Sequence, residues 1–320
     1  MLTLLDALTS RNVEVDSQAP SGTNTTIETS VRPNSWVPWE DFNYGTLTRI
    51  FETELSSPYR ETPVPRPLHK DLVVQNEETL EDLLRRFVVP TVNYALDGQA
   101  KRPHFGRGSR CNNSSIKPDW SLISDEHISR DRFLNLVPGD TKLGAKWRPS
   151  MAVENSQQWK KVLAQVATYM VASLSRYGFI LTDKHLVALR LTRRHIQPGL
   201  AQNRPRRETA GRGRADSDAT MTDSSGGSEY IDNDPQAWMW CDPEYATITW
   251  ESYGKGSLTI KLALWCLAMM ATHGDSFVDY SYPSLDSWRT VDDGYVHNTS
   301  GARKSKLDQN DTLQELGLGD

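Results

Sequence analysis

The sequence predicts an α/β fold from three observations. Residues 76–96 and 156–176 place apolar side chains at the three- and four-residue spacing of amphipathic helices. Residues 117–124 and 133–143, which lie between them, are short apolar runs of strand length. Two further strand candidates follow the second helix, so the order is helix, two strands, helix, two strands. Such an alternation is typical of a domain that combines a sheet with helices.

The composition favours a globular, intracellular protein. Hydrophobic residues make up 37% of the 320 residues, which is enough for a core. The three cysteines are an odd number and form no C-x-x-C pair, which argues against a disulfide framework and a thiolate zinc site. The N-terminus has no basic region before its apolar run, unlike a signal peptide. The longest apolar run, 262–271, is too short to span a membrane, and we expect no membrane association.

Charge is distributed unevenly along the chain. The net charge is −5, but residues 101–214 hold 22 Lys and Arg against 8 Asp and Glu. The remainder holds 14 Lys and Arg against 33 Asp and Glu. A basic middle between acidic ends favours a polyanionic partner such as nucleic acid. The alternative is a compositional accident, caused in part by the Arg-rich stretch after residue 200.

Low-complexity composition predicts disorder outside the central domain. Residues 1–35 are rich in Ser, Thr, Asn and Pro without a period, so we expect a disordered N-terminal arm. Residues from about 197 to 234 are first basic and then acidic, which predicts a disordered insertion. Residues 291–320 are expected to form a polar tail. The structured domain is therefore placed at 36–290.

Local signals refine the N-terminal half of this domain. Residues 36–44 carry four aromatic side chains that are expected to attach the segment to the core, and a short helix follows at 44–55. Asn76 is a candidate N-cap for the next helix, whose first turn is acidic. Pro90 should kink or divide that helix, because proline removes a backbone donor.

The C-terminal half is expected to continue with strands and one further helix. Gly178 is placed to end the helix that begins at 156. Residues 179–181 and 186–191 predict a hairpin, and residues 245–253 predict another strand. Residues 257–273 are strongly apolar and predict a buried helix.

Three residues stand at informative places in this order. Pro118-Asp119 is the only Pro-Asp dipeptide of the chain and opens the first predicted strand. Asp140-Thr141-Lys142 is the only (D/E)-x-K tripeptide and lies in the second. Residues i and i+2 of a strand point to the same face, so Asp140 and Lys142 project together. Asp119, on a neighbouring strand, can reach the same place.

Such a cluster suits a divalent cation and a phosphate. Two carboxylates and the Thr141 carbonyl are hard oxygen ligands of the kind that Mg²⁺ prefers. The metal would activate water, and Lys142, with a pKa lowered by the metal and by partial burial, would orient or deprotonate it. The alternative is that Asp119 is a turn residue and that Asp140 and Lys142 form a solvated surface pair after Pro138.

This arrangement resembles the PD-(D/E)XK nuclease superfamily, and more narrowly a fungal family of PD-(D/E)XK nuclease-like proteins. The matching stretches lie within residues 75–275 and read KPDWSLIS, VPGDTKLGAKW, QWKKVLAQVATYM, RYGFILTDKHLVALRLTR and SLTIKLALWCLAMM. The resemblance implies a restriction-endonuclease-like core, in which a central mixed sheet is flanked by helices. It also implies Mg²⁺- or Mn²⁺-dependent hydrolysis of phosphodiester bonds in nucleic acid, with DNA as the expected substrate.

The resemblance also implies roles for individual residues. Asp119 and Asp140 would bind the metal, and Lys142 would be the catalytic lysine. Gln165 matches a polar position that supports the site. A glutamate of the first helix often joins the metal, and the candidates are Glu78 and Glu81, of which Glu81 is the one we assign.

Basic residues near the predicted site are candidates for phosphate contacts. Lys146, Arg148, Lys160 and Lys161 are expected to form a nucleic-acid-binding rim, the alternative being an ordinary solvated helix face. The run 104–108 is expected to be a loop that is basic enough to touch a backbone phosphate.

The sequence therefore favours a metal-dependent nuclease. The alternative is a catalytically inactive module that keeps the nuclease fold and binds nucleic acid, or binds a protein through the predicted disordered arms. The basic segment 204–214 and the expected substrate together suggest a nuclear location.

Overall fold

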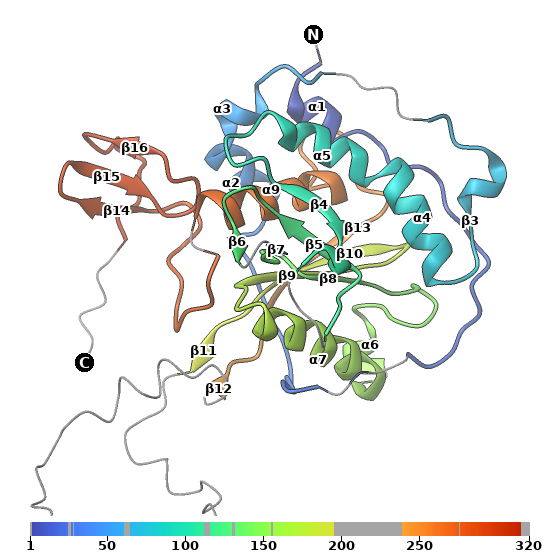
Figure 1. The fold of residues 1–320 in the computed structure, drawn as a ribbon. Coiled ribbons are helices and arrows are strands. Elements are labelled where there is room, and N and C mark those ends of the chain that lie inside the picture. The colour runs from blue at the N-terminus through green and yellow to red at the C-terminus, as the bar shows by residue number, and fades with distance from the viewer. Residues whose placement is uncertain are drawn as a thin grey trace, which may run out of the picture.

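A seven-stranded mixed sheet lies at the centre, and helices cover both of its faces (Figure 1). The computed structural model describes residues 2–24, 27, 29–60, 65–111, 116–129, 132–154, 156–194, 239–274 and 276–314. In spatial order the strands are β2 (Val37–Pro38), β13 (Glu244–Thr249), β10 (His185–Arg190), β9 (Tyr177–Leu181), β8 (Gly139–Thr141), β5 (Trp120–Ile123) and β4 (His104–Arg107). The pairs β2–β13 and β8–β9 are parallel and the other neighbours are antiparallel. The predicted mixed α/β class with a helix-flanked sheet is thus confirmed.

The helices divide between the two faces of the sheet (Figure 1). One face carries α1 (Leu4–Leu8), α5 (Val89–Asp97) and α9 (Ile260–His273), and the other carries α7 (Ser156–Ala172). The remaining helical segments are α2 (Tyr44–Ile50), α3 (Glu52–Leu55), η1 (His69–Leu72), α4 (Glu77–Phe87), η2 (Gly108–Arg110) and α6 (Met151–Glu154). Three short two-residue ladders lie outside the main sheet, β1 (Asp16–Ser17) with β3 (Val73–Val74), β6 (Ile128–Ser129) with β7 (Arg132–Phe133), and β11 (Arg193–Arg194) with β12 (Met239–Trp240).

Alternation along β9 and β10 explains why the sheet is covered on both sides. In β9, Phe179 faces the cluster around α9, whereas Ile180 faces the cluster around α7. In β10, Leu186 and Val187 divide in the same way. Successive side chains of a strand point to opposite faces, so a strand that is apolar at every position needs a helix on each side.

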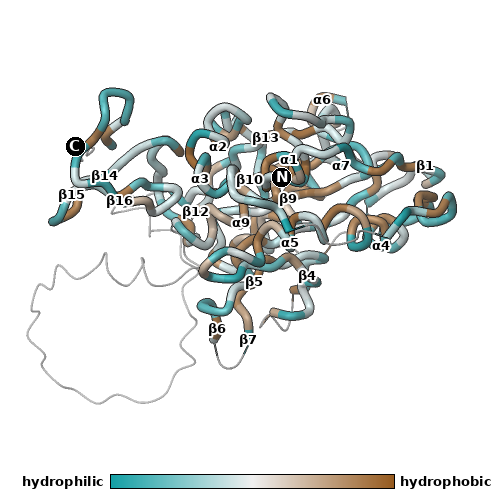
Figure 2. The backbone as a smooth tube through the Cα atoms, turned by 90° about the horizontal axis from the view of Figure 1, so that it is seen from above, coloured by the Kyte–Doolittle hydropathy of each residue, from teal (hydrophilic) through white to brown (hydrophobic). Residues whose placement is uncertain are grey.

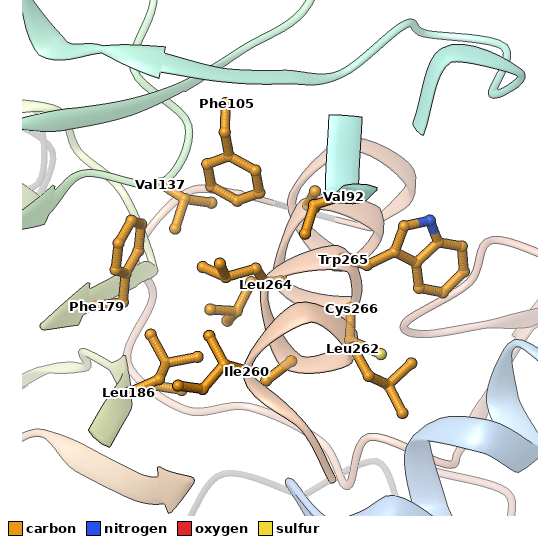
Figure 3. Close-up of a cluster of buried hydrophobic side chains, with 14 of the residues drawn as sticks. Val92, Phe105, Val137, Phe179, Leu186, Ile260, Leu262, Leu264, Trp265 and Cys266 are labelled. Carbon is orange, nitrogen blue, oxygen red and sulfur yellow. The ribbon is translucent and has the colours of Figure 1, made fainter. Parts of the chain in front are cut away.

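The centre of the larger cluster is α9, whose residues from Ile260 to Thr272 are all buried. Figure 3 shows Ile260 and Leu264 pointing from this helix toward Leu186 and Phe179 of the sheet, while Trp265 points the other way. A helix that is apolar around its whole circumference has to be covered on every side. The predicted buried helix at 257–273 is confirmed, and it begins at Ile260 after the N-cap Thr259.

The N-terminal arm supplies part of that cover, so the prediction of a disordered arm at 1–35 is wrong for the residues that the structure describes. Leu4 and Leu8 of α1 are buried beside α5 and α9. Thr259 donates a hydrogen bond to the Leu8 carbonyl at 2.6 Å, and Lys261 Nζ lies 2.6 Å from Ser10 Oγ. A five-residue helix has no stability of its own and forms here through these tertiary contacts, which composition does not reveal.

Two of the helix boundaries follow from single residues. The Asn76 side chain accepts a hydrogen bond from the Thr79 N–H at 2.8 Å, which confirms the predicted N-cap. The predicted helix 76–96 divides at Val88 into α4 and α5, with Pro90 in the first turn of the second. The prediction that Gly178 ends the later helix is wrong, since α7 stops at Ala172 and Gly178 lies within β9.

Strand lengths differ from the predictions. Of the strand expected at 133–143, only Gly139–Thr141 belongs to the main sheet. This strand, β8, pairs antiparallel with β5. A Cβ atom on Gly139 would lie 2.2 Å from Phe179 Cζ, so the close approach of β8 to the Phe179 ring requires glycine. The run 104–108, expected to be a loop, instead contributes the edge strand β4.

The described part of the predicted polar tail is folded. A small antiparallel sheet is formed by β14 (Trp288–Val291), β15 (Gly294–His297) and β16 (Arg303–Lys304). Figures 1 and 2 show it at the opposite end of the molecule from α4. The insertion predicted at about 197–234 lies outside the described residues. Among the helices that the structure describes, none has the length and apolar character needed to cross a membrane.

The packing of α9 yields a stability prediction. Leu264 is 1% exposed, and Leu264→Ala is expected to lower the free energy of unfolding by about 2–5 kcal/mol because it leaves a cavity between helix and sheet. Denaturant unfolding followed by far-UV circular dichroism measures this loss. The control Leu68→Ala makes the same chemical change at a side chain that is 67% exposed, and it should stay within about 0.5 kcal/mol.

Candidate active site

Two neighbouring strands bring Asp119 and Asp140 together. Asp119 directly precedes β5 and Asp140 is the central residue of β8, and the two strands pair through Trp120 and Gly139. Asp119 Oδ2 accepts a hydrogen bond from the Thr141 N–H at 2.8 Å. The Trp120 indole N–H donates a hydrogen bond to Thr141 Oγ1 at 2.7 Å, which holds Thr141 in place between Asp140 and Lys142.

Asp140 and Lys142 form a buried ion pair. Lys142 Nζ lies 2.5 Å from Asp140 Oδ2 and donates a hydrogen bond to the Thr141 carbonyl at 3.1 Å. The residues are 1% and 3% exposed, so the alternative of a solvated surface pair is wrong. The two side chains project together as the strand alternation predicted, although Lys142 stands one residue beyond the last residue of β8.

A second acid near Lys142 is a residue that the sequence interpretation missed. Glu77, the first residue of α4, places Oε2 4.0 Å from Lys142 Nζ. The candidates from the sequence were Glu78 and Glu81 of this helix. Glu77 lies four positions before Glu81, and residues at this spacing share a helix face. The assignment of Glu81 could therefore have led to Glu77 from the sequence.

Gln165 approaches the pair from α7 on the other side. Its Nε2 lies 3.5 Å from Asp140 Oδ1, the long limit of a hydrogen bond, and donates to the Tyr169 hydroxyl at 2.7 Å. The sequence did not single out Tyr169, because a tyrosine on the apolar face of a helix is usually a core residue. Burial and the nearby charge of Asp140 raise the pKa of Tyr169, so its hydroxyl stays protonated.

Burial dominates the electrostatics of the cluster. It raises the pKa of Asp140 well above the usual value, and the neighbouring Asp119 carboxylate adds to that rise while Lys142 opposes it. Burial acts to lower the pKa of Lys142, but the charges of Asp140 and Glu77 outweigh it and the pKa is raised. The sequence interpretation expected a lowered pKa for Lys142. In this structure the acids around the ammonium stabilise its charged form instead.

The donor set suits a hard divalent cation. Apart from its ion pair with Lys142, Asp140 Oδ2 is buried without a hydrogen-bond donor, and Gln165 Oε1 is buried without one as well. Within the described ranges, no three His, Cys, Asp or Glu side chains are grouped as a metal site. A cation here would therefore rely on Asp119, Asp140, the Thr141 carbonyl and water, a set that Mg²⁺ accepts.

The cluster adjoins an open cleft with a volume of about 460 Å³. Its lining is Glu78, Glu81, Asp82, Arg85, Arg107, Gly108, Ser109, Lys117, Pro118 and Asp119. Asp119 therefore belongs both to the cluster and to the cleft. Burial, followed by the charge of Asp119, raises the pKa of Glu81 above 4.5.

Comparison with protein-family models, with curated proteins and with solved structures finds no match for this chain. A function is therefore inferred from the geometry of the cluster and its cleft.

The four residues predicted as a nucleic-acid-binding rim do not line this cleft. Arg148 is engaged by Glu154 at 2.5 Å, and Lys146, Lys160 and Lys161 are partly buried around the start of α7. Their role in binding stays a prediction. Among the described residues, the basic side chains that do line the cleft are those of Arg85, Arg107 and Lys117. Of these, only Arg107 lies in a segment, 104–108, that the sequence predicted to touch a backbone phosphate.

The raised pKa of Glu81 gives a pH-dependent prediction. A carboxyl group whose pKa is higher in the folded than in the unfolded state stabilises the fold only below its unfolded pKa, and that stability is lost as the pH rises through the folded pKa. Glu81→Gln should therefore raise Tm at pH 7 in EDTA, and the gain should vanish as the pH falls below 4.5. Thermal unfolding between pH 4 and pH 7 measures the trend. Glu78→Gln, at an exposed position of the same helix, is the control, and an equal gain in both variants would contradict the assignment.

Proposed function

We propose that this chain is a metal-dependent nuclease of the PD-(D/E)XK type, with a restriction-endonuclease-like core, that hydrolyses phosphodiester bonds in nucleic acid, with DNA as the expected substrate. The observation that supports it best is the buried Asp140–Lys142 ion pair beside Asp119 at the edge of an open cleft. A buried charged pair is costly for stability, and such pairs are characteristic of functional sites. An intracellular, nuclear location is part of this proposal.

The carboxylates and the carbonyl would hold the metal. Asp119, Asp140 and the Thr141 carbonyl oxygen are the ligands that we assign to Mg²⁺ or Mn²⁺, and Glu81 lies on the cleft side of Asp119. When bound, the cation supplies positive charge that stabilises the phosphate in the transition state and lowers the pKa of a nearby water. Gln165 and Tyr169 would keep the Asp140 carboxylate oriented.

Lys142 and the cation would compete for the same oxygens. The Lys142 ammonium contacts both Asp140 Oδ2 and the Thr141 carbonyl, two of the three assigned ligands. Replacement of that contact by a divalent charge would leave the ammonium free to turn toward the substrate phosphate or the attacking water. It would also offset the charge of Asp140, one of the acids that now raise the pKa of Lys142. Lys142 would thereby become competent for proton transfer.

A cleavage assay tests the catalytic roles. Asp140→Asn and Lys142→Ala are each expected to lower the rate of cleavage of labelled single- and double-stranded DNA in Mg²⁺ or Mn²⁺ by about 10²–10⁴-fold. Asp293→Ala and Lys306→Ala, on exposed positions near the small C-terminal sheet, are charge-matched controls and should keep the wild-type rate. Equal rates in wild type and both site variants would overturn the assignment. Absence of cleavage by all of them would favour the inactive binding module.

Metal binding separates the role of Lys142 from that of Asp140. Isothermal titration with Mn²⁺ should show that Asp140→Ala abolishes binding, because it removes a ligand. Lys142→Ala should bind Mn²⁺ at least as tightly as wild type, because it removes the competing ammonium. Weaker binding by Lys142→Ala would contradict the competition between lysine and metal for the same oxygens. Circular dichroism spectra establish that each variant is folded.

A further inference from the structure

The two walls of the cleft carry opposite charge. The α4 wall presents Glu78, Glu81 and Asp82, whereas the wall formed by the end of β4 and the approach to β5 presents Arg107 and Lys117. Asp119 follows directly after the second wall. A polyanion in this cleft would therefore be attracted to one wall and repelled by the other, which fixes the side on which its phosphates lie.

The basic residues of the cleft differ in their availability. Arg85 is held by Glu81 and Asp82 at 3.2 Å each, so its charge is already compensated. In the part of the chain that the structure describes, neither Arg107 nor Lys117 forms an ion pair. Two cations that form no described ion pair thus line a polar cleft, where they can bind phosphate without first breaking such a pair.

The backbone holds these two cations close to Asp119. The Gly108 N–H donates to the Asp119 carbonyl at 3.1 Å, which ties the segment of Arg107 to the site. A Cβ atom on Gly108 would lie only 1.9 Å from the Pro118 carbonyl oxygen, so the two segments touch through their backbones and only glycine fits between them. Arg107 and Lys117 are therefore neighbours of Asp119 through rigid backbone contacts rather than through a flexible loop.

The chemistry of the lining favours a sugar–phosphate backbone over bases. None of the described residues that line the cleft is aromatic. Binding of exposed bases relies on aromatic platforms, whereas contacts to phosphate use Arg, Lys, hydroxyls and backbone N–H groups. The Ser109 side chain and the cations of this wall are of the second kind.

We propose that Arg107 and Lys117 bind the phosphates next to the scissile bond, so that the cleft takes a nucleic-acid strand by its backbone and without regard to base sequence. The inference rests on the proposed function, because it defines how the substrate of that site is held. Arg107 and Lys117 are binding residues in this proposal, and the reacting groups are those around Asp140.

Binding without turnover tests the inference. Fluorescence anisotropy in EDTA measures the affinity of the full chain for labelled 20-nucleotide DNA of two unrelated sequences, single- and double-stranded, between 50 and 200 mM salt. Arg107→Ala and Lys117→Ala are each expected to weaken binding about tenfold. The double variant should reduce the dependence of log K on log salt by about 2, one for each lost phosphate contact. The matched control is Arg303→Ala with Lys306→Ala, the same charge change at the far end of the molecule, which should bind as wild type does (Figure 1).

The outcomes separate this inference from the proposed catalysis. Wild-type affinity and salt dependence in the Arg107→Ala, Lys117→Ala double variant would overturn it, as would a wild-type protein that strongly prefers one of the two sequences. Weakened binding in the double variant supports it even if wild type cleaves nothing in Mg²⁺ or Mn²⁺. In that case the cleft binds backbone phosphates, and the catalytic proposal alone fails.

Discussion

A helix that is apolar around its whole circumference cannot face water on any side, and α9 imposes this constraint on the rest of the molecule. The sheet covers one side of it through Phe179 and Leu186, and α1 and α5 cover the other. The N-terminal arm folds because it completes this cover, with Lys261 and Thr259 holding its backbone. The order of the sheet around α9 then decides which strand ends meet, and therefore where Asp119 and Asp140 lie.

The buried charges of the candidate site lower the stability of the fold, and the packing of this core compensates for that loss. A carboxylate and an ammonium buried together lose hydration that their mutual attraction only partly restores. The structure limits this cost with additional hydrogen bonds, from the Thr141 N–H to Asp119 and from Lys142 to the Thr141 carbonyl. It does not satisfy every group, since within the described structure Gln165 Oε1 has no hydrogen-bond donor and Asp140 Oδ2 is met by Lys142 alone. A buried charged pair beside a side-chain amide that is only partly satisfied is the pattern expected where function rather than stability selects the residues.

Local charge, and not net charge, determines what the cleft attracts. The chain as a whole is acidic, with a net charge of −5, and the α4 side of the cleft is acidic as well. The opposite wall nevertheless offers two cations, Arg107 and Lys117, that form no ion pair in the described structure. Potentials near a surface are dominated by charges within about 10 Å at ordinary ionic strength, so this wall can hold a phosphate although the whole molecule repels one.

The sequence by itself determined the periodic elements and the pairs that lie close along the chain. Apolar spacing predicted α7 and α9, capping predicted Asn76, and strand alternation predicted that Asp140 and Lys142 project together, because each depends on neighbouring residues only. Tertiary structure decided the rest. Glu77, Arg107 and Lys117 reach the site from segments whose approach depends on chain packing, and α1 is a helix only because α5 and α9 bury it. Contacts across the sheet and over α9 have no local signature, since they arise from the burial of apolar surface that the whole chain shares.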